Sequence, residues 1–258
     1  MSDDLQSDLA RAEAALHEAM AVLRRHAAAG PVAYELKDGW SPVTAADREA
    51  DALLRRRLPL PGDGWLSEES EDEPSRLQAH RVWIVDPLDG TRSFIAGRAD
   101  YSVSIALVCD GRPVLGAIGC PASGVTVLGT LGLGVTTQGD PRLGWEDGDG
   151  LRILASRSET KRGEWQAVAP RCRIRPVGSV AYKLALVAGG WADGTWTMHP
   201  KHEWDVAAGA ALVVAAGGEV WLPRGGHLLW NRSRPRFLSF AAAAPGLRTA
   251  ITGLQSGA

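Results

Sequence analysis

The chain has 258 residues, 45% of them hydrophobic, which is enough for one large domain or two closely joined domains with a sizeable core. Its formal net charge is only −2, so neither a nucleic-acid polymer nor an anionic membrane surface is an expected partner. No apolar run approaches the roughly 20 residues of a transmembrane helix, and the acidic N-terminus has no signal-peptide pattern.

The three cysteines, Cys109, Cys120 and Cys172, are odd in number and show no CxxC spacing. This usage favours a reducing compartment, and together with the N-terminus it predicts a cytoplasmic protein. A metal site made of thiolates is therefore not expected.

Two helices are predicted near the N-terminus. Leucine, alanine and methionine residues recur at steps of three and four and predict an amphipathic helix over about 5–28, which ends before a Gly-Pro pair. The stretch SPVTAADREADALLRRRL (41–58) predicts a second helix. Thr44 is a suitable N-cap for it, and Asp47 stands three residues later in the capping-box position.

The next region predicts strands of one sheet. RVWIVD (81–86) is typical of a buried strand, and the DGT turn after it predicts a short helix from Thr91. The three strands expected to follow are YSVSIALV (101–108), PVLGAIGC (113–120) and GVTVLGT (124–130).

Glycine, aspartate and proline cluster over 132–150, which predicts a loop and a soft domain boundary. Strand and helix patterns then alternate, which favours an α/β fold. The predicted elements are strands at LRILAS (151–156) and CRIRPV (172–177), helices at 158–168, 179–189 and 204–216, and late strands at GGEVWL (217–222) and RFLSF (236–240).

Two carboxylates, Asp86 and Asp89, stand at the end of the predicted buried strand in the sequence WIVDPLDGT. Buried carboxylates are costly unless a cation compensates them, and Arg92 supplies the one positive charge nearby in sequence. Mg²⁺ prefers carboxylate, carbonyl and water oxygens. The spacing therefore predicts neighbouring ions bridged by Asp86, with the Leu88 carbonyl as a further ligand.

Gly90 and Thr91 follow these acids directly and place backbone N–H groups at a predicted helix start, which suits a phosphate group. A metal-binding turn next to a phosphate cradle indicates metal-assisted phosphoryl chemistry.

Three other acids are open to two interpretations each. Asp47 can serve only in the capping box, and Glu68 lies in the run SEESEDE, which is typical of a solvated loop. Asp205 follows Trp204 at a predicted helix start, where an acid also suits the helix dipole. Each of the three is also a candidate for the metal chemistry.

Four motifs together resemble the inositol monophosphatase superfamily, whose members are Mg²⁺-dependent, lithium-sensitive phosphatases. They are PVTAAD (42–47), SEES (67–70), DPLDGT (86–91) and EWDVAAG (203–209), in the family's order and rough spacing. The resemblance runs from about residue 5 to 245. It implies an αβαβα sandwich, in which an α+β half packs on an α/β half.

The resemblance implies a ligand set. Glu68, Asp86 and the Leu88 carbonyl would bind a first metal ion, and Asp86, Asp89 and Asp205 would bind a second. We expect two or three Mg²⁺ ions, with Mn²⁺ as a substitute.

The resemblance also implies catalytic roles. Asp47 and Thr91 would orient and deprotonate the attacking water, and Glu68 is a further candidate catalytic residue. A third ion would lie near Glu68 and Asp47, held largely through waters. Residues 1–140 would then carry the metal turn and this dyad, whereas 141–258 would carry the last metal aspartate and the substrate contacts.

These motifs specify the substrate less closely than they specify the metal site. Inositol-selective relatives have an acid where this chain has Met198, whereas SEES and Lys183 look more like the bacterial 3′(2′),5′-bisphosphate nucleotidases, which act on adenosine 3′,5′-bisphosphate. Lys183 would meet a second phosphate, unless it is an ordinary solvent-facing lysine. Ser179 and Glu203 are further substrate-binding candidates, although Glu203 can equally be a helix-start residue.

The expected partner is thus a small phosphate ester, and a homodimer is left open. Inositol monophosphatase and sugar or histidinol phosphate phosphatase activities are alternatives. A catalytically weak metal-binding regulator is the alternative from a different class.

Overall fold

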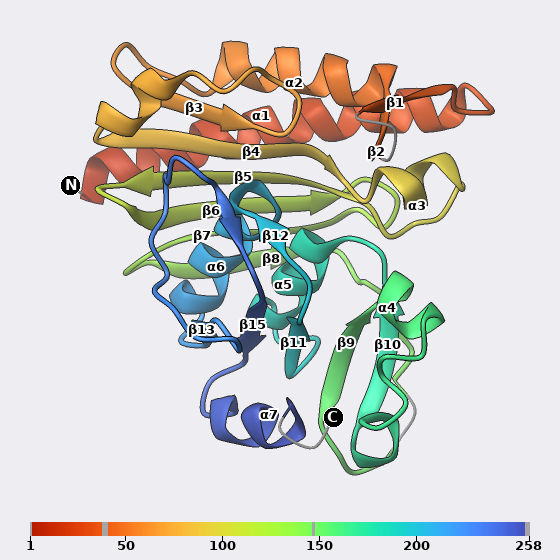
Figure 1. Cartoon of the computed structure of the whole chain (residues 1–258). Coiled ribbons are helices and arrows are strands. Elements are labelled where there is room, and N and C mark those ends of the chain that lie inside the picture. The colour runs from red at the N-terminus through yellow and green to blue at the C-terminus, as the bar shows by residue number, and fades with distance from the viewer. Residues whose placement is uncertain (1, 38–40, 146–147, 256–258) are drawn as a thin grey trace.

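Five layers of secondary structure are stacked in the computed structural model, which describes residues 2–37, 41–145 and 148–255 (Figure 1). Two N-terminal helices cover a six-stranded sheet, and two central helices separate it from a five-stranded sheet. A C-terminal helix covers the far side of the second sheet. The predicted α/β class and αβαβα layering are confirmed.

The first layer is formed by α1 (Ser2–Ala28) and α2 (Ala45–Arg57). The helix predicted over 5–28 is therefore present and begins slightly earlier. Its buried stripe, which packs toward the sheet, contains Ala12, Ala15, Leu16, Ala19, Met20 and Leu23.

The predicted capping box at the start of α2 is confirmed. The Thr44 Oγ1 atom accepts hydrogen bonds from the N–H groups of Ala46 and Asp47 at 3.1 and 3.4 Å, and an Asp47 oxygen accepts from the Thr44 N–H at 2.7 Å. The residues before this cap are not helical. They form β2 (Ser41–Thr44), which pairs antiparallel with β1 (Tyr34–Lys37).

The six-stranded sheet has the order β3-β4-β5-β6-β7-β8. Only β3 and β4 run parallel, and the other neighbours are antiparallel. The strands are β3 (Gly64–Ser67), β4 (Arg81–Asp89), β5 (Ser102–Cys109), β6 (Arg112–Cys120), β7 (Val125–Thr130) and β8 (Gly134–Gln138). A short 3₁₀ helix, η1 (Pro74–Gln78), follows β3.

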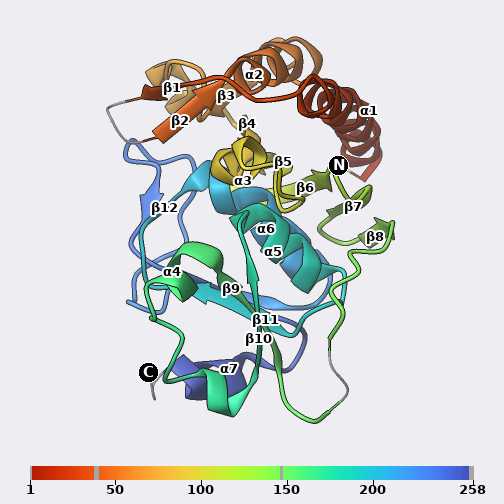
Figure 2. The ribbon, with the colours of Figure 1, turned by 90° about the vertical axis from the view of Figure 1, so that its right-hand side faces the viewer.

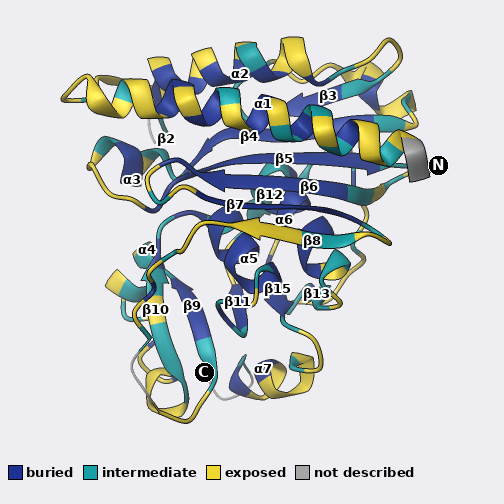
Figure 3. Cartoon of the chain, turned by 180° about the vertical axis from the view of Figure 1, so that it is seen from behind, coloured by how far each residue is buried: buried dark blue, intermediate teal, exposed yellow. Residues whose placement is uncertain are grey.

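The loop predicted over 132–150 is wrong at its start, because β8 lies within it. This edge strand has the sequence GVTTQ and is largely exposed (Figure 3), so it lacks the apolar alternation that marks a strand in sequence. Pairing with β7 stabilises it instead. Residues 146–147 of the predicted loop lie outside the described residues.

The two central helices are α5 (Val180–Ala188) and α6 (Glu203–Ala215). They are apolar on most sides because a sheet lies on each face. Gly116 of β6 allows α6 to approach closely, since a Cβ atom there would lie 2.4 Å from the Ala208 carbonyl oxygen.

The five-stranded sheet has the order β10-β9-β11-β15-β13, and α7 (Arg248–Gln255) packs against it through Ile251 and Leu254. Its strands are β9 (Arg152–Ser156), β10 (Arg173–Val177), β11 (Gly194–Thr197), β13 (Glu219–Trp221) and β15 (Phe240–Ala243). The remaining short elements are α4 (Arg157–Lys161), η2 (Ala169–Arg171), β12 (Lys201–His202) and β14 (Arg236–Phe237).

Two predicted elements differ from the structure. The helix expected over 158–168 is limited to the five residues of α4 and is followed by turns around Gly163. RFLSF does not form one strand: β14 pairs with β12, whereas β15 joins the large sheet. β11 and α7 were not predicted.

The functional motifs gather at one side of the molecule. Figure 2 shows α3 (Thr91–Ile95), α4 and the first turns of α5 and α6 on this side. Over the described residues, no helix is both long enough and apolar enough to cross a membrane.

Candidate metal centre and active-site cleft

Three aspartates from two distant parts of the chain meet at the end of β4. Asp86, Asp89 and Asp205 each place one carboxylate oxygen within 4.8 Å of the others. The pairing of β4 with β5 shifts register between Asp86 and Asp89, so the strand turns where the acids lie. Gly90 continues the turn with φ +94°, a conformation that favours glycine.

The starts of the two central helices hold two of these aspartates. Oδ2 of Asp89 accepts hydrogen bonds from the Ser179 hydroxyl and the Ala181 N–H, both at 2.6 Å, at the start of α5. Oδ2 of Asp205 accepts from the His202 N–H at 2.9 Å, at the start of α6. Both acids are therefore oriented before any ion binds.

Among these acids, Asp86 has the surroundings that most strongly indicate a bound cation. Its Oδ1 accepts from the Leu88 N–H at 3.0 Å, whereas its Oδ2 is buried and has no hydrogen-bond partner among the described residues. Burial, followed by the charges of Glu68 and Asp89, raises the pKa of Asp86 well above its usual value. A hard divalent cation would compensate this orphaned oxygen, so the residues fit Mg²⁺.

Glu68 faces the same cluster. Burial and the charge of Asp205 raise the pKa of Glu68 to about 8, and burial and Asp205 raise the pKa of Asp89 to about 6. Lys37 compensates the negative charge of Glu68 only weakly, because its Nζ lies 3.9 Å from Glu68 and forms a shorter ion pair with Glu69. The acids therefore repel one another unless cations lie between them.

Asp47 serves the helix cap and also reaches the metal turn. Oδ2 of Asp47 accepts from the Thr44 N–H and hydroxyl, while Oδ1 lies 3.2 Å from Oγ1 of Thr91. The Thr91 hydroxyl is also 3.1 Å from the Leu88 carbonyl oxygen, and its single proton can be donated to one of the two acceptors at a time. Burial is the main cause of the raised pKa of Asp47.

A cleft of about 480 Å³ opens onto these groups. The carboxylates of Glu68, Asp86, Asp89 and Asp205 line it together with Leu88, Gly90 and Thr91. Basic and hydroxyl residues from the later half of the chain line the same cleft, namely Ser156, Arg157, Ser158, Lys161 and Lys201. One ligand can thus contact the acidic cluster and positive charge at once.

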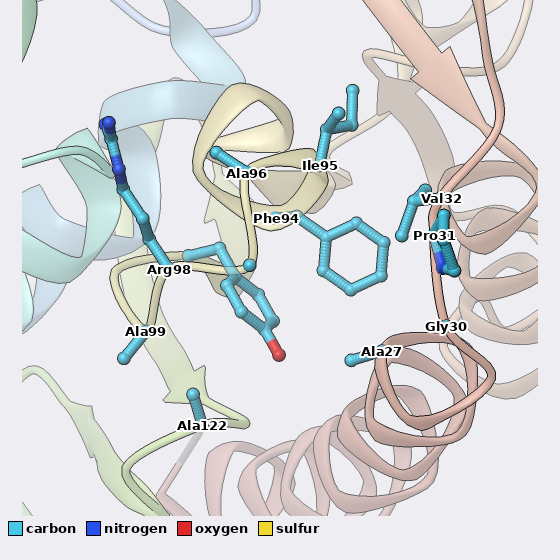
Figure 4. Close-up of a pocket in the computed structure, with 12 residues that line it drawn as sticks. Ala27, Gly30, Pro31, Val32, Phe94, Ile95, Ala96, Arg98, Ala99 and Ala122 are labelled. Carbon is cyan, nitrogen blue, oxygen red and sulfur yellow. The ribbon is translucent and has the colours of Figure 1, made fainter.

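A second cavity, of about 510 Å³, lies beside α3 (Figure 4). Its described lining includes Pro31, Val32, Phe94 and Ile95 and contains no carboxylate, so it is not the site of the chemistry. Arg98 lines both cavities.

The three predicted substrate residues, Ser179, Lys183 and Glu203, are all absent from the described lining of the cleft. Ser179 is fully buried, where it caps α5 by accepting from the Tyr182 N–H at 2.9 Å and donates to Asp89. Its contact is with a proposed metal ligand rather than with substrate.

Lys183 is 1% exposed, so the solvent-facing interpretation of this lysine is wrong. Burial lowers the pKa of Lys183 to about 8, against the opposing effects of Glu159 and Asp89. The lysine is buried in α5, and its positive charge interacts with the carboxylate of Asp89.

The prediction that Glu203 contacts substrate directly also differs from the structure. It is fully buried, and its carboxylate accepts from the N–H groups of Asn231 and Arg232 at 2.7 and 3.2 Å. These bonds occupy both oxygens and turn them away from the cleft.

Arg157 and Lys161 were not predicted as site residues. They line the cleft together with Lys201. An isolated arginine or lysine in sequence is usually solvated, so no local signal marked them. Asp100 orients Arg157 through an ion pair that includes an Nε contact at 3.1 Å.

The inositol monophosphatase family model matches residues 4–248 of the chain. This chain belongs to the inositol monophosphatase family. It is therefore a phosphatase, which agrees with the acidic cluster and the cleft.

Curated relatives in this family carry two kinds of name. The 3′-phosphoadenosine 5′-phosphate phosphatase of Mycobacterium leprae is 37% identical over 226 residues, which is 81% of this chain and 80% of that protein. The 3′(2′),5′-bisphosphate nucleotidase CysQ of Salmonella typhimurium is 35% identical over 90% of this chain and 94% of its own length. An inositol-1-monophosphatase of Mycobacterium leprae is 32% identical over 81% of this chain and 76% of that protein.

Solved structures of the family share the fold. CysQ from Bacteroides thetaiotaomicron superposes with a TM-score of 0.76 at 29% identity and covers 93% of this chain and 97% of its own. An inositol monophosphatase from Thermotoga maritima gives a TM-score of 0.77 at 27% identity, covering 98% and 97%.

Proposed function

We propose that this phosphatase removes the 3′-phosphate of adenosine 3′,5′-bisphosphate with bound Mg²⁺. The observation that carries the proposal is the mixed lining of the cleft, where the acidic cluster shares one space with Arg157, Lys161 and Lys201. A substrate with two phosphates uses both sets of groups. The names of the mycobacterial and Salmonella relatives support the same substrate class.

Glu68, Asp86, Asp89, Asp205 and the Leu88 carbonyl would hold the metal. Bound Mg²⁺ neutralises phosphate charge and lowers the pKa of coordinated water. Gly90 and Thr91 line the cleft beside these acids, and their backbone amides would bind phosphate oxygens.

Asp47 and Thr91 would remove the proton of the attacking water. The water gives its proton to Oγ1 of Thr91 as the threonine proton passes to Oδ1 of Asp47, 3.2 Å away. The raised pKa of Asp47, caused chiefly by burial, makes its carboxylate a better base.

Hydrolysis of inositol 1-phosphate is the second candidate, favoured by the inositol-1-monophosphatase relative. Met198 argues against this second activity. The residue is 40% exposed and is absent from the described cleft lining. Its thioether also cannot bind ring hydroxyls by hydrogen bonds as a carboxylate would.

The proposal includes two or three Mg²⁺ ions with Mn²⁺ as a substitute. The cytoplasmic location and the homodimer stay predictions. So does the division of labour between residues 1–140 and 141–258.

The direct test is product analysis after incubation of the purified protein with adenosine 3′,5′-bisphosphate and Mg²⁺. We expect release of inorganic phosphate together with adenosine 5′-monophosphate. Accumulation of adenosine 3′-monophosphate, or no turnover alongside rapid hydrolysis of inositol 1-phosphate, contradicts the proposal.

A further inference from the structure

The carboxylate of Glu203 is a buried anchor at the start of α6, two residues before Asp205. It accepts from the Asn231 N–H at 2.7 Å, and from the N–H and Nε of Arg232, both at 3.2 Å. The Glu203 N–H in turn donates to the Pro235 carbonyl at 2.9 Å. The first turn of α6 is therefore tied to the segment 231–235 by both backbone and side-chain bonds.

The side chain of Asn231 links this segment to Arg76. Its Oδ1 accepts from Nη1 of Arg76 at 2.6 Å, and its Nδ2 donates to the Arg76 carbonyl at 2.9 Å. The two bonds require both halves of an amide, so aspartate or leucine cannot replace it. The residue adopts φ +58°, which asparagine tolerates better than most residues.

Arg76 completes the connection to the segment that carries Glu68. Its guanidinium is 1% exposed and binds Asp72 through Nε at 2.5 Å and Nη2 at 2.8 Å, four residues beyond Glu68. Nη2 also donates to the Arg232 carbonyl at 3.0 Å. Figure 1 shows that the segment between β13 and β14 rises to the level of β4.

We propose that Arg76, Asn231 and Glu203, called here the anchor network, position Glu68 and Asp205 relative to each other and thereby set the affinity of the metal centre. This inference rests on the proposed function, in which both acids bind Mg²⁺. The anchor network joins the two segments that supply these acids from different halves of the chain. Its members act through the ligands and contact neither metal nor substrate.

The chemistry of the anchor network favours this role over simple stabilisation. A fully buried carboxylate and a buried guanidinium lose their hydration, and apolar side chains of similar size often stabilise a fold as well or better. What apolar packing does not supply is a fixed direction for each hydrogen bond. Groups that orient metal ligands from behind commonly alter metal affinity by 10–100-fold when changed.

The test is Mg²⁺ binding to the whole protein without substrate, measured by isothermal titration calorimetry and by tryptophan fluorescence, since Trp204 adjoins Asp205. Glu203→Gln replaces one acceptor oxygen by a donor that faces N–H groups. Asn231→Gly removes the amide but keeps the backbone conformation, because glycine tolerates φ +58°. Ser233→Ala, at an exposed position on the same segment and outside the lining of the cavity beside Glu68, is the control.

We expect both anchor variants to bind Mg²⁺ about 10–100-fold more weakly, with kcat restored to within about twofold at saturating Mg²⁺. Ser233→Ala should bind like the unaltered protein. Circular dichroism establishes folding, and Asn231→Gly carries the test if Glu203→Gln fails to fold.

Asp205→Asn separates the two ideas. If Asp205→Asn loses Mg²⁺ binding while both anchor variants bind normally, the anchor proposal is wrong and the proposed metal site stands. If Asp205→Asn binds Mg²⁺ normally, the proposed metal site fails. A fall in kcat that saturating Mg²⁺ does not restore in the anchor variants also overturns the positioning role.

Discussion

Oγ1 of Thr91 lies 3.2 Å from Oδ1 of Asp47, a residue 44 positions earlier in the chain. Asp47 is fixed by the cap of α2 and Thr91 by the turn after β4, so two independent local structures bring the pair together. The same carboxylate thus stabilises a helix start with one oxygen and faces the metal turn with the other.

Thr91→Ala should lower kcat on the order of 10²–10⁴-fold, because it removes the hydroxyl that passes the water proton to Asp47. Mg²⁺ affinity should change little, since no Thr91 side-chain atom is a proposed ligand. Steady-state rates at saturating Mg²⁺, with Thr91→Ser as the control that keeps the hydroxyl, make the measurement. Equal rates for the alanine and serine variants would remove Thr91 from the mechanism.

Asp86→Asn should be the most damaging single substitution, with kcat lowered on the order of 10³-fold or more. The buried Oδ2 of Asp86 has no partner among the described residues and is the oxygen best placed for an ion. Because the change also removes charge repulsion, the metal-free variant should melt at a higher temperature than the metal-free parent. Calorimetry in EDTA checks this, and near-native turnover contradicts the role of Asp86.

The stability of the metal-free protein should fall as pH rises. The pKa of Glu68 is raised to about 8 and that of Asp89 to about 6, whereas both acids titrate near 4 when unfolded. The folded state therefore holds extra protons between these values, so the stability present below pH 4 is lost as pH passes through about 6 and 8.

Bound Mg²⁺ compensates the same charges, so the rise in melting temperature from Mg²⁺ should be on the order of 5 °C larger at pH 8.5 than at pH 5. Paired melts in EDTA and in Mg²⁺ at both pH values provide the measurement. A Mg²⁺ effect that is equal at both values, or larger at pH 5, contradicts the repulsive acidic cluster.

Ca²⁺ and Li⁺ should inhibit at fixed Mg²⁺. Ca²⁺ accepts longer bonds and looser geometry than Mg²⁺, which spoils the alignment of water and phosphate. Lithium sensitivity follows from the family and its shared DPLDGT turn. Initial rates during millimolar titrations of each salt, with KCl as the control, make the test, and unchanged rates with both ions count against the site.

Local motifs made much of this site predictable. Asp86, Asp89 and Thr91 lie within six residues at a strand end, and the capping box of Thr44 and Asp47 needs only one turn of helix. The cost of leaving acids at a buried strand end was enough to indicate metal.

Features that depend on distant partners were not predictable in this way. Glu203 was a candidate substrate contact because it lies close in sequence to Met198, which stands at the position of the missing acid, yet its carboxylate accepts hydrogen bonds from the N–H groups of residues 231 and 232. Arg157 reaches the cleft through α4 and Asp100, neither of which marks it in sequence. The edge strand β8 was missed because its stabilisation comes from pairing with β7 rather than from apolar alternation.

The most direct measurement of the central claim compares kcat/KM for adenosine 3′,5′-bisphosphate, adenosine 3′-monophosphate and inositol 1-phosphate at saturating Mg²⁺, in the parent protein and in Lys161→Gln. The bisphosphate should be the best substrate of the three. Lys161→Gln should lower kcat/KM for the bisphosphate about 10-fold or more, as expected for a lost charge-assisted contact, and leave adenosine 3′-monophosphate almost unchanged. A parent protein that prefers inositol 1-phosphate, or a Lys161→Gln variant that treats both nucleotides alike, contradicts the account.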